Sequence, residues 1–262
     1  MKSKLTKLTL SIILTLTIIS LAVVLTLVCK PLYYLDIHAL HIPETTGCTI
    51  SEIKANYNAV IDYCLSFGNA PLEFPTFPMS EGGRIHFEEV KNIFNLFKYM
   101  VIGGTLASTA GILWMRRKHC YGYLKLTAIL TVALPAIIGA AVALNWDRTF
   151  VTFHEIAFNN DYWLFDPATD PVINILPDLY FLHCAVMILA LVILGSILCA
   201  WAYRAEKGKT TNNTNKKELI SGKTDLNISS SYFKVWTIGR ASYALIIVTS
   251  LFDMRFRKSI TE

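Results

Sequence analysis

The sequence has little charge and few of the features that mark a soluble protein. Of its 262 residues, 16% are charged, 53% are hydrophobic, and the mean hydropathy is +0.45. It has no Cys-x-x-Cys or His-Glu-x-x-His pattern, and its six cysteines do not form a disulfide framework. These absences exclude collagen-like, disordered and disulfide-knot classes. They also argue against nucleic acid as a partner, although the pI is 8.8.

Four long apolar segments are present, and each is long enough to cross a hydrocarbon core of about 30 Å. They cover about residues 8–29, 93–115, 121–144 and 179–203. The first is too long for the apolar region of a signal peptide, and no small-x-small cleavage site follows it, so we expect it to be retained. The sequence therefore predicts an all-α integral membrane protein with four transmembrane helices.

The charges that flank these spans predict the orientation of the chain. The loops at residues 30–90 and 145–178 contain four basic and fourteen acidic residues, a net charge of −10, whereas the remainder carries +15. Basic residues are retained on the cytoplasmic side, so we expect both termini to be cytoplasmic. The two acidic loops then form an extracytoplasmic cap. We expect short strands in it, because residues 35–42 alternate and predict an extended segment with His38 and His41 solvated.

We expect two segments along the chain, a four-span membrane domain at residues 1–209 and a cytoplasmic linker and tail at residues 210–262. The apolar run at residues 241–252 is too short for a fifth span and is typical of an interfacial amphipathic helix.

Small residues such as Gly104 predict close packing of the spans. Lys98, near the outer end of the second span, either extends its amine to the interface or faces a substrate. Cys48 and Cys64 are the two cysteines that could form a disulfide in the outer loops, but their spacing in the sequence does not decide whether they do.

The stretch from Pro78 to Val90 places a histidine just before the second span. Gly82 and Gly83 indicate a turn, and the following residues favour a helix, so we expect His86 in the first turn of an extended second helix. The helix dipole disfavours a protonated imidazole there, so the side chain is available as a base. Glu88 and Glu89 both lie within one turn of His86 and can orient it.

The second outer loop is rich in aromatic residues, Asn, Asp and Pro, which is typical of an ordered, hydrogen-bonded loop at the membrane interface. It contains His154 directly after the third span, and Trp163 serves there as an interfacial anchor or as a contact for substrate. Asp170 precedes Pro171 and predicts a turn or a helix start. Because spans two and three form a hairpin, we expect His86 and His154 to approach each other.

Two motifs carry a resemblance to a known family. They are MSEGGRIHFEEVK, residues 79–91, and FHEIAFNNDYWLFDPATDPVINILP, residues 153–177. Together they resemble the lipoprotein intramolecular transacylase family, Lit, of bacterial four-span integral membrane proteins, with a resemblance over about residues 5–205. It implies an acyltransferase of the bacterial plasma membrane that moves the sn-2 acyl chain of an S-diacylglyceryl-cysteine lipoprotein to the α-amino group of the same cysteine. It implies diacylated lipoproteins as substrate and no cofactor or metal.

The family relies on two outer-face histidines, which match His86 and His154 here. We expect His154 to be the base that deprotonates the amine, oriented by Glu155 or Asp170, and His86 to protonate the leaving alkoxide or bind the oxyanion, although these roles can be exchanged. The residues expected to bind or orient substrate are Arg84, Glu89, Glu155, Asn160, Trp163 and Asp170.

Two alternatives remain open from the residues themselves. The first is a metal-dependent membrane lipid hydrolase, in which the two histidines and carboxylates such as Glu89 or Asp170 hold a zinc ion. The second is a non-enzymatic membrane adaptor whose aromatic outer loops dock on lipid. Sensitivity to chelators separates the first alternative from acyl transfer, and histidine substitutions that leave function intact favour the second.

Overall fold

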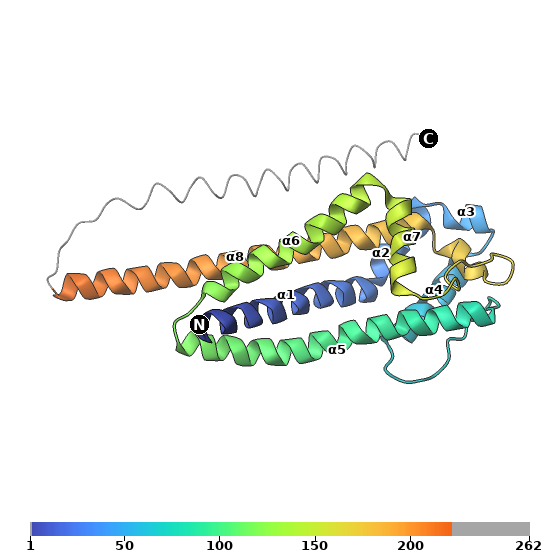
Figure 1. The fold of residues 1–262 in the computed structure, drawn as a ribbon. Coiled ribbons are helices and arrows are strands. Elements are labelled where there is room, and N and C mark those ends of the chain that lie inside the picture. The colour runs from blue at the N-terminus through green and yellow to red at the C-terminus, as the bar shows by residue number, and fades with distance from the viewer. Residues whose placement is uncertain (1, 222–262) are drawn as a thin grey trace.

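The computed structural model describes residues 2–221, and every regular element within this range is a helix. Four long apolar helices are capable of crossing a membrane, and they lie side by side along the molecule (Figure 1). These helices are α1 (Lys2–Val28), α5 (Glu81–Arg117), α6 (Gly122–Leu144) and α8 (Asp178–Ser221). Each of the four predicted spans is contained in one of these helices to within a residue at its ends, so the four expected helices are present.

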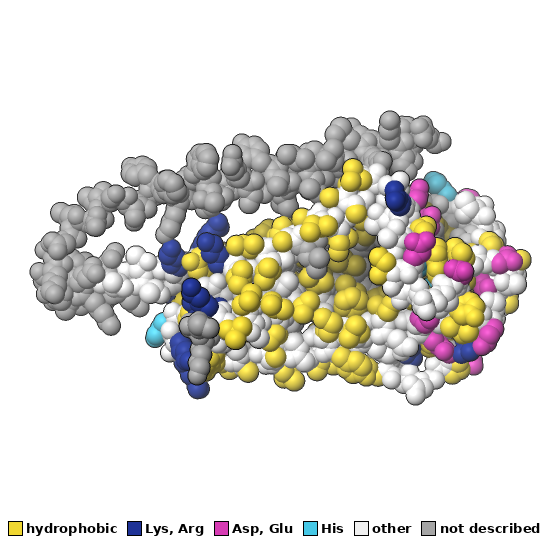
Figure 2. Space-filling model, in the orientation of Figure 1, with side chains coloured by type: hydrophobic (Ala, Val, Ile, Leu, Met, Phe, Trp, Pro, Cys, Tyr) yellow, Lys and Arg dark blue, Asp and Glu magenta, His cyan; other side chains and the backbone are white. Residues whose placement is uncertain are grey.

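Helix α1 is the common packing partner, since it lies against α5, α6 and α8. Close packing with α5 requires glycine at position 104, where an added Cβ would lie 2.2 Å from the Thr17 hydroxyl oxygen. The opposite faces of the spans carry exposed apolar side chains such as Leu106 and Ile137, which are 69% and 71% exposed. On the face drawn in Figure 2, hydrophobic side chains cover much of the middle of the bundle, as lipid contact requires.

One end of the bundle carries three short helices and a 3-10 turn, which we call the end cap. It contains α2 (Lys30–Ala39), α3 (Ile42–Thr46), α4 (Ile50–Leu65) and η1 (Pro171–Ile175) (Figure 1). Its core is built around Tyr33, whose ring stacks on Tyr57 at 3.7 Å and whose hydroxyl donates to the Ile175 carbonyl. The two outer loops predicted from the sequence therefore fold together into one packed unit.

The expectation of short strands is wrong for the described residues. Residues 35–42, expected to be extended, form the end of α2, a turn, and the start of α3. The helical conformation is favoured here because Tyr33 and Ile37 are one turn apart, so that both side chains are buried on one face of the helix. His41 adopts a left-handed conformation, with φ 51°, at the junction of the two helices.

Two polar contacts tie the end cap to the spans. The His183 Nδ1 atom of α8 lies 2.9 Å from both carboxylate oxygens of Asp36 in α2. The Lys98 ammonium of α5 donates to the carbonyls of Cys64, Leu65 and Ser66, at 2.8, 2.9 and 3.0 Å, and so binds the C-terminal end of α4. Lys98 therefore neither extends to the interface nor faces a substrate.

Two further expectations concern the cysteines and the linker. Cys48 and Cys64 are both free thiols, so the disulfide that the sequence left open is not formed. The polar segment after residue 209 begins as helix, because α8 continues to Ser221. Its sequence up to Ser221 contains neither Pro nor Gly after Gly208, so nothing in it stops the helix. The amphipathic helix expected at residues 241–252 lies outside the described residues.

Candidate active site

Helix α5 extends well beyond the membrane, which places its first turns in the end cap. At 1.5 Å per residue its 37 residues are about 55 Å long, against a hydrocarbon core of about 30 Å. Residues 81–92 carry five charged side chains, so this is the portion that projects. The membrane-crossing part of α5 is therefore the apolar stretch at about residues 93–115, and His86 lies outside it.

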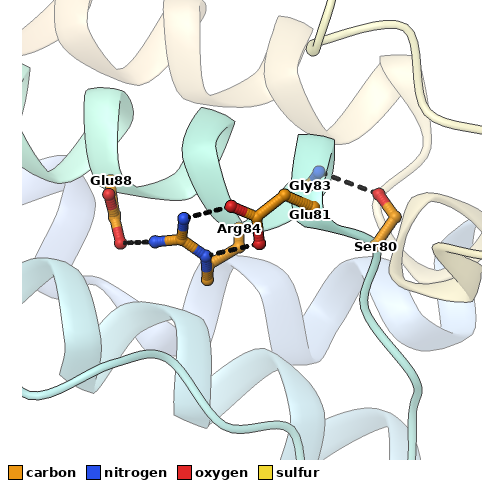
Figure 3. Close-up of polar contacts among 5 residues, drawn as sticks. All are labelled: Ser80, Glu81, Gly83, Arg84 and Glu88. Atoms are coloured by element: carbon orange, nitrogen blue, oxygen red, sulfur yellow. Dashed lines mark hydrogen bonds and ion pairs between the residues drawn. The ribbon is translucent and has the colours of Figure 1, made fainter.

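The helix begins earlier than the sequence suggested, because Ser80 caps it. The Ser80 hydroxyl accepts a hydrogen bond from the Gly83 backbone N–H at 2.9 Å (Figure 3). Gly82 and Gly83 therefore lie inside the helix and do not form a turn, and His86 falls in the second turn. Gly83 also permits a close approach, since an added Cβ would lie 2.3 Å from an Asp170 carboxylate oxygen. That same oxygen accepts from the Ser80 N–H at 2.8 Å.

His154 lies on a helix, which corrects the expected loop. Helix α7 (Trp146–Ala157) starts after Asn145, whose side-chain oxygen accepts from the Arg148 N–H at 2.9 Å. The His154 Nδ1 atom is 2.8 Å from the Phe150 carbonyl, one turn earlier. A carbonyl only accepts, so Nδ1 carries the hydrogen and Nε2 keeps a free lone pair. His154 is thereby arranged as a base.

The two histidines lie close together, as expected from the hairpin of spans two and three. Their ring centroids are 6.2 Å apart. His86 is only 6% exposed, and its Nδ1 atom has no hydrogen-bond partner among the described residues. A substrate group held between the two rings is within reach of both.

Aromatic rings form the walls around the pair. Phe158 lies 4.7 Å from the His86 ring and 5.7 Å from the His154 ring, while Trp163 lies 4.9 Å from His154. Phe165 contacts His86 at 5.3 Å and Phe150 contacts His154 at 4.2 Å. These three phenylalanines were not among the site residues predicted from the sequence. Phe150, His154 and Phe158 are four residues apart, which places their side chains on one face of a helix. This spacing is informative only if the segment is known to be helical.

Burial among these aromatic rings lowers the pKa of both imidazoles. Burial lowers the pKa of His86 to about 4, and the positive charge that His154 carries when protonated adds to the effect. Burial also lowers the pKa of His154, although its bond to the Phe150 carbonyl and the charge of Asp178 oppose the shift. Both rings are therefore neutral at pH 7, as a base and a neutral hydrogen-bond donor require.

Glu89 and Asn160 are brought to the site together. The Asn160 side-chain amide donates to Glu89 Oε1 at 2.8 Å, and the Tyr162 N–H donates to Asn160 Oδ1 at 3.0 Å. These contacts fix the loop that carries Phe158 and Trp163 against α5. Of the residues expected to bind or orient substrate, Trp163 contacts His154, while Glu89, one turn after His86 on α5, is joined to Asn160.

The other three expected residues have different contacts. Arg84 lies between Glu81 and Glu88 on the surface of α5 and pairs with both (Figure 3). Asp170 is 2% exposed and binds the Ser80 N–H and the Thr169 hydroxyl, so it joins the loop to the start of α5 and does not orient a histidine. Glu155 is exposed on α7, and the Phe150 carbonyl takes the orienting position next to His154.

The described residues contain no group of three or more His, Cys, Asp or Glu side chains arranged to hold a metal ion. The polar contacts of the site are therefore those of two imidazoles, one carboxylate and one amide. Aromatic rings surround the two imidazoles.

Comparison with known proteins gives a consistent result. The sequence model of a family described as "Lipoprotein intramolecular transacylase Lit" matches residues 8–181. A similar solved structure is the membrane integral lipoprotein intramolecular transacylase Lit from Bacillus cereus, with 37% identity and a TM-score of 0.77, covering 79% of this chain and 97% of that one. Variants of that enzyme with one histidine replaced by arginine or by alanine are both 36% identical, with TM-scores of 0.74 and 0.73. The match to the arginine variant covers 80% of this chain, and the match to the alanine variant covers 79% of it. Each match covers 94% of the variant's own chain. No curated protein matches the sequence.

Proposed function

This chain belongs to the lipoprotein intramolecular transacylase family, and from that premise we propose how its site performs the transfer. Membership makes it a membrane acyltransferase that acts on lipoproteins, and this replaces the hydrolase and the adaptor that the sequence alone left open. The reaction we propose moves the sn-2 acyl chain of the S-diacylglyceryl cysteine to the α-amino group of the same cysteine. The product is an N-acylated lyso lipoprotein.

The observation that carries this proposal is the pair of neutral imidazoles, 6.2 Å apart within aromatic walls. The substrate amine is itself the nucleophile, so the enzyme need not form a covalent intermediate. It must hold the amine next to the ester, remove protons from the amine and stabilise an oxyanion. Two histidines with lowered pKa values supply the last two functions.

His154 is the base, because its free Nε2 lone pair is fixed by the Nδ1 contact to the Phe150 carbonyl. It first accepts a proton from the substrate ammonium and releases that proton to water. The neutral amine then attacks the ester carbonyl carbon. His154 accepts a second proton from the amine and delivers it to the glyceryl oxygen as the bond between the carbonyl carbon and that oxygen breaks.

His86 binds the oxyanion that forms during the attack. The sequence left two roles for it, protonation of the alkoxide or oxyanion binding. A pKa of about 4 favours the second role, because the ring is then a neutral N–H donor throughout the reaction. Its burial strengthens that hydrogen bond, since water does not compete for the oxyanion.

The end cap and the histidine pair lie on the extracytoplasmic side of the bacterial plasma membrane, and both termini are cytoplasmic. Figure 2 supports this orientation, because Lys and Arg gather at one end of the bundle and Asp and Glu at the other. The acidic end is the end that carries the end cap. Basic residues retained on the cytoplasmic side leave the cap outside.

Mass spectrometry of the N-terminal peptide of a lipoprotein tests the function. Cells that express this protein are expected to convert the diacylated peptide into the N-acylated lyso peptide. His86→Gln and His154→Gln are expected to reduce the conversion by about 10² to 10⁴-fold, the range for general acid–base groups.

Substrates with light and heavy acyl chains, mixed in one reaction, test whether the transfer is intramolecular. Each product is expected to keep both chains of its own parent molecule. Products that combine a light and a heavy chain, or an acylated enzyme, would show that the protein itself carries the acyl group and that the roles given to the histidines are wrong.

A further inference from the structure

Glu89 has a carboxylate oxygen that the contacts of the site do not account for. Its Oε1 atom accepts from Asn160, but its Oε2 atom is buried and has no hydrogen-bond partner within residues 2–221. Among the described residues it is the one carboxylate with such an oxygen. A buried carboxylate oxygen without a donor is costly, so its presence at a site points to a ligand that supplies the donor.

The nearby cations of α5 are engaged elsewhere. Arg84 is held by Glu81 and Glu88 on the helix surface. The Lys91 ammonium donates to the Gly68 carbonyl at 2.7 Å, and the Lys98 ammonium donates to three carbonyls at the end of α4. None of these three has an ion pair with Glu89, so its negative charge is available to a cation that enters with the substrate.

The position of Glu89 places that charge beside the reacting groups. Glu89 follows His86 by three residues on α5, so the two side chains project from the same face of the helix. Asn160 holds Oε1 from the loop that also brings Phe158 against both imidazoles and Trp163 against His154. The Asn160 bond also orients the carboxylate and leaves Oε2 as the acceptor for a donor from the site.

We propose that Glu89 binds the α-ammonium group of the lipoprotein's N-terminal cysteine and positions it for the transfer. This inference rests on the proposed function, which supplies an ammonium as the attacking group. An N–H of that ammonium donates to Glu89 Oε2. After His154 removes a proton, the amine retains two N–H groups, so it still donates to Glu89 while its lone pair faces the ester.

A consequence follows for the choice of substrate. A lipoprotein that is already N-acylated has a neutral amide in place of the ammonium, so it cannot form a charge-assisted hydrogen bond with Glu89. Glu89 therefore makes the enzyme selective for lipoproteins with a free amino terminus. The same property favours release of the product, which is itself N-acylated.

The test compares two ligands on the full-length protein in lipid nanodiscs. Both are S-dialkylglyceryl-cysteine peptides with ether-linked chains, which cannot transfer, and one has a free α-amine while the other is N-acetylated. Wild type is expected to bind the free amine about tenfold or more tightly than the N-acetyl ligand. Glu89→Gln is nearly isosteric and keeps an acceptor for Asn160. It is expected to remove this preference by weakening the free-amine ligand, with less than about twofold change for the N-acetyl ligand.

Glu88→Gln is the matched control, because Glu88 is the adjacent residue, of the same type, paired with Arg84 on the exposed face. It is expected to retain the preference. Equal weakening of both ligands by Glu89→Gln would indicate a merely structural role and overturn the inference, as would an unchanged preference. If wild type nevertheless converts the ester-linked substrate to the lyso product, the proposed function stands without Glu89. A wild type that binds both ligands equally and forms no product would overturn both.

Discussion

At His154, a backbone carbonyl decides which ring nitrogen acts as the base. The Phe150 carbonyl lies one turn earlier on α7, 2.8 Å from Nδ1. Hydrogen bonding of this kind fixes the tautomer and the ring orientation at once. From the sequence, a carboxylate, Glu155 or Asp170, was expected in this role. A carbonyl one turn away is present in every helix, so no side-chain pattern distinguishes it.

The burial of His86 predicts how the stability of the protein depends on pH. Its pKa is about 4 in the folded chain, against an ordinary value of 6.5. Between these values the unfolded chain binds a proton that the folded chain does not, so the free energy of unfolding decreases as the pH falls from about 6.5 towards 4. The change is at most about 1.4 kcal/mol for each pH unit in this window.

Thermal unfolding of wild type and His86→Gln, measured at pH 7 and at pH 5, checks this expectation. Glutamine does not titrate, so the variant is expected to lose less of its Tm on acidification than wild type. An equal loss in both proteins would mean that His86 is accessible to protons in the folded chain.

At the level of elements, the junction between α5 and the loop before η1 depends on the absence of a side chain at Gly83. Gly83→Ala would place a Cβ 2.3 Å from Asp170 Oδ1 and 3.2 Å from Phe165 Cε1. Overpacking of this kind typically costs about 1–3 kcal/mol, so we expect a lower Tm. We also expect about tenfold or greater loss of activity, because Phe165 contacts the His86 ring.

Gly103→Ala is the matched control for this substitution, since it lies on the same helix and nothing lies within 4 Å of the added Cβ. Alanine is the better helix former, so the control is expected to leave activity unchanged and the Tm equal or slightly raised. Gly83→Ala that behaved like this control would show that the contact between α5 and Asp170 is not needed.

The spans could be predicted from sequence, whereas α7 could not. A run of about twenty apolar residues in lipid must form a helix, because only a helix satisfies all of its backbone hydrogen bonds within the segment. The four spans therefore follow from composition. Helix α7 has no such run, and its aromatic residues are equally compatible with an interfacial loop. Its helical state depends on the Asn145 cap and on the packing of Phe150, His154 and Phe158 around the site.

Some features of the site could be predicted from the sequence, and others could not. The proximity of His86 and His154 follows from the hairpin of two adjacent spans, so topology alone predicts it. The contact of Asn160 with Glu89 joins the loop after α7 to α5, and only the folded chain reveals it. The ion pairs of Arg84 with Glu81 and Glu88 were not expected, although carboxylates three residues before and four residues after an arginine on one helix are placed to pair with it.

At the scale of the whole molecule, the separation of charge between the two ends predicts the topology. Single cysteines placed at Asn69, after α4, and at Ala168, before η1, are both at exposed positions. They are expected to react with a membrane-impermeant maleimide in intact cells that express an otherwise cysteine-free chain. A cysteine at Thr210, which is exposed and lies near the C-terminal end of α8, is expected to react only after lysis. The reverse pattern would invert the orientation and place the histidine pair in the cytoplasm.

The contact of Asp170 with Ser80 also bears on how the enzyme is made. Ribosomes synthesise His86 well before Asp170, which fixes the first turn of its helix, and before Phe158 and Trp163, which enclose the two rings. A nascent chain with three spans already inserted therefore has both histidines but lacks the contacts that surround them. We expect activity only after the segment that carries Phe158, Trp163 and Asp170 has packed against α5.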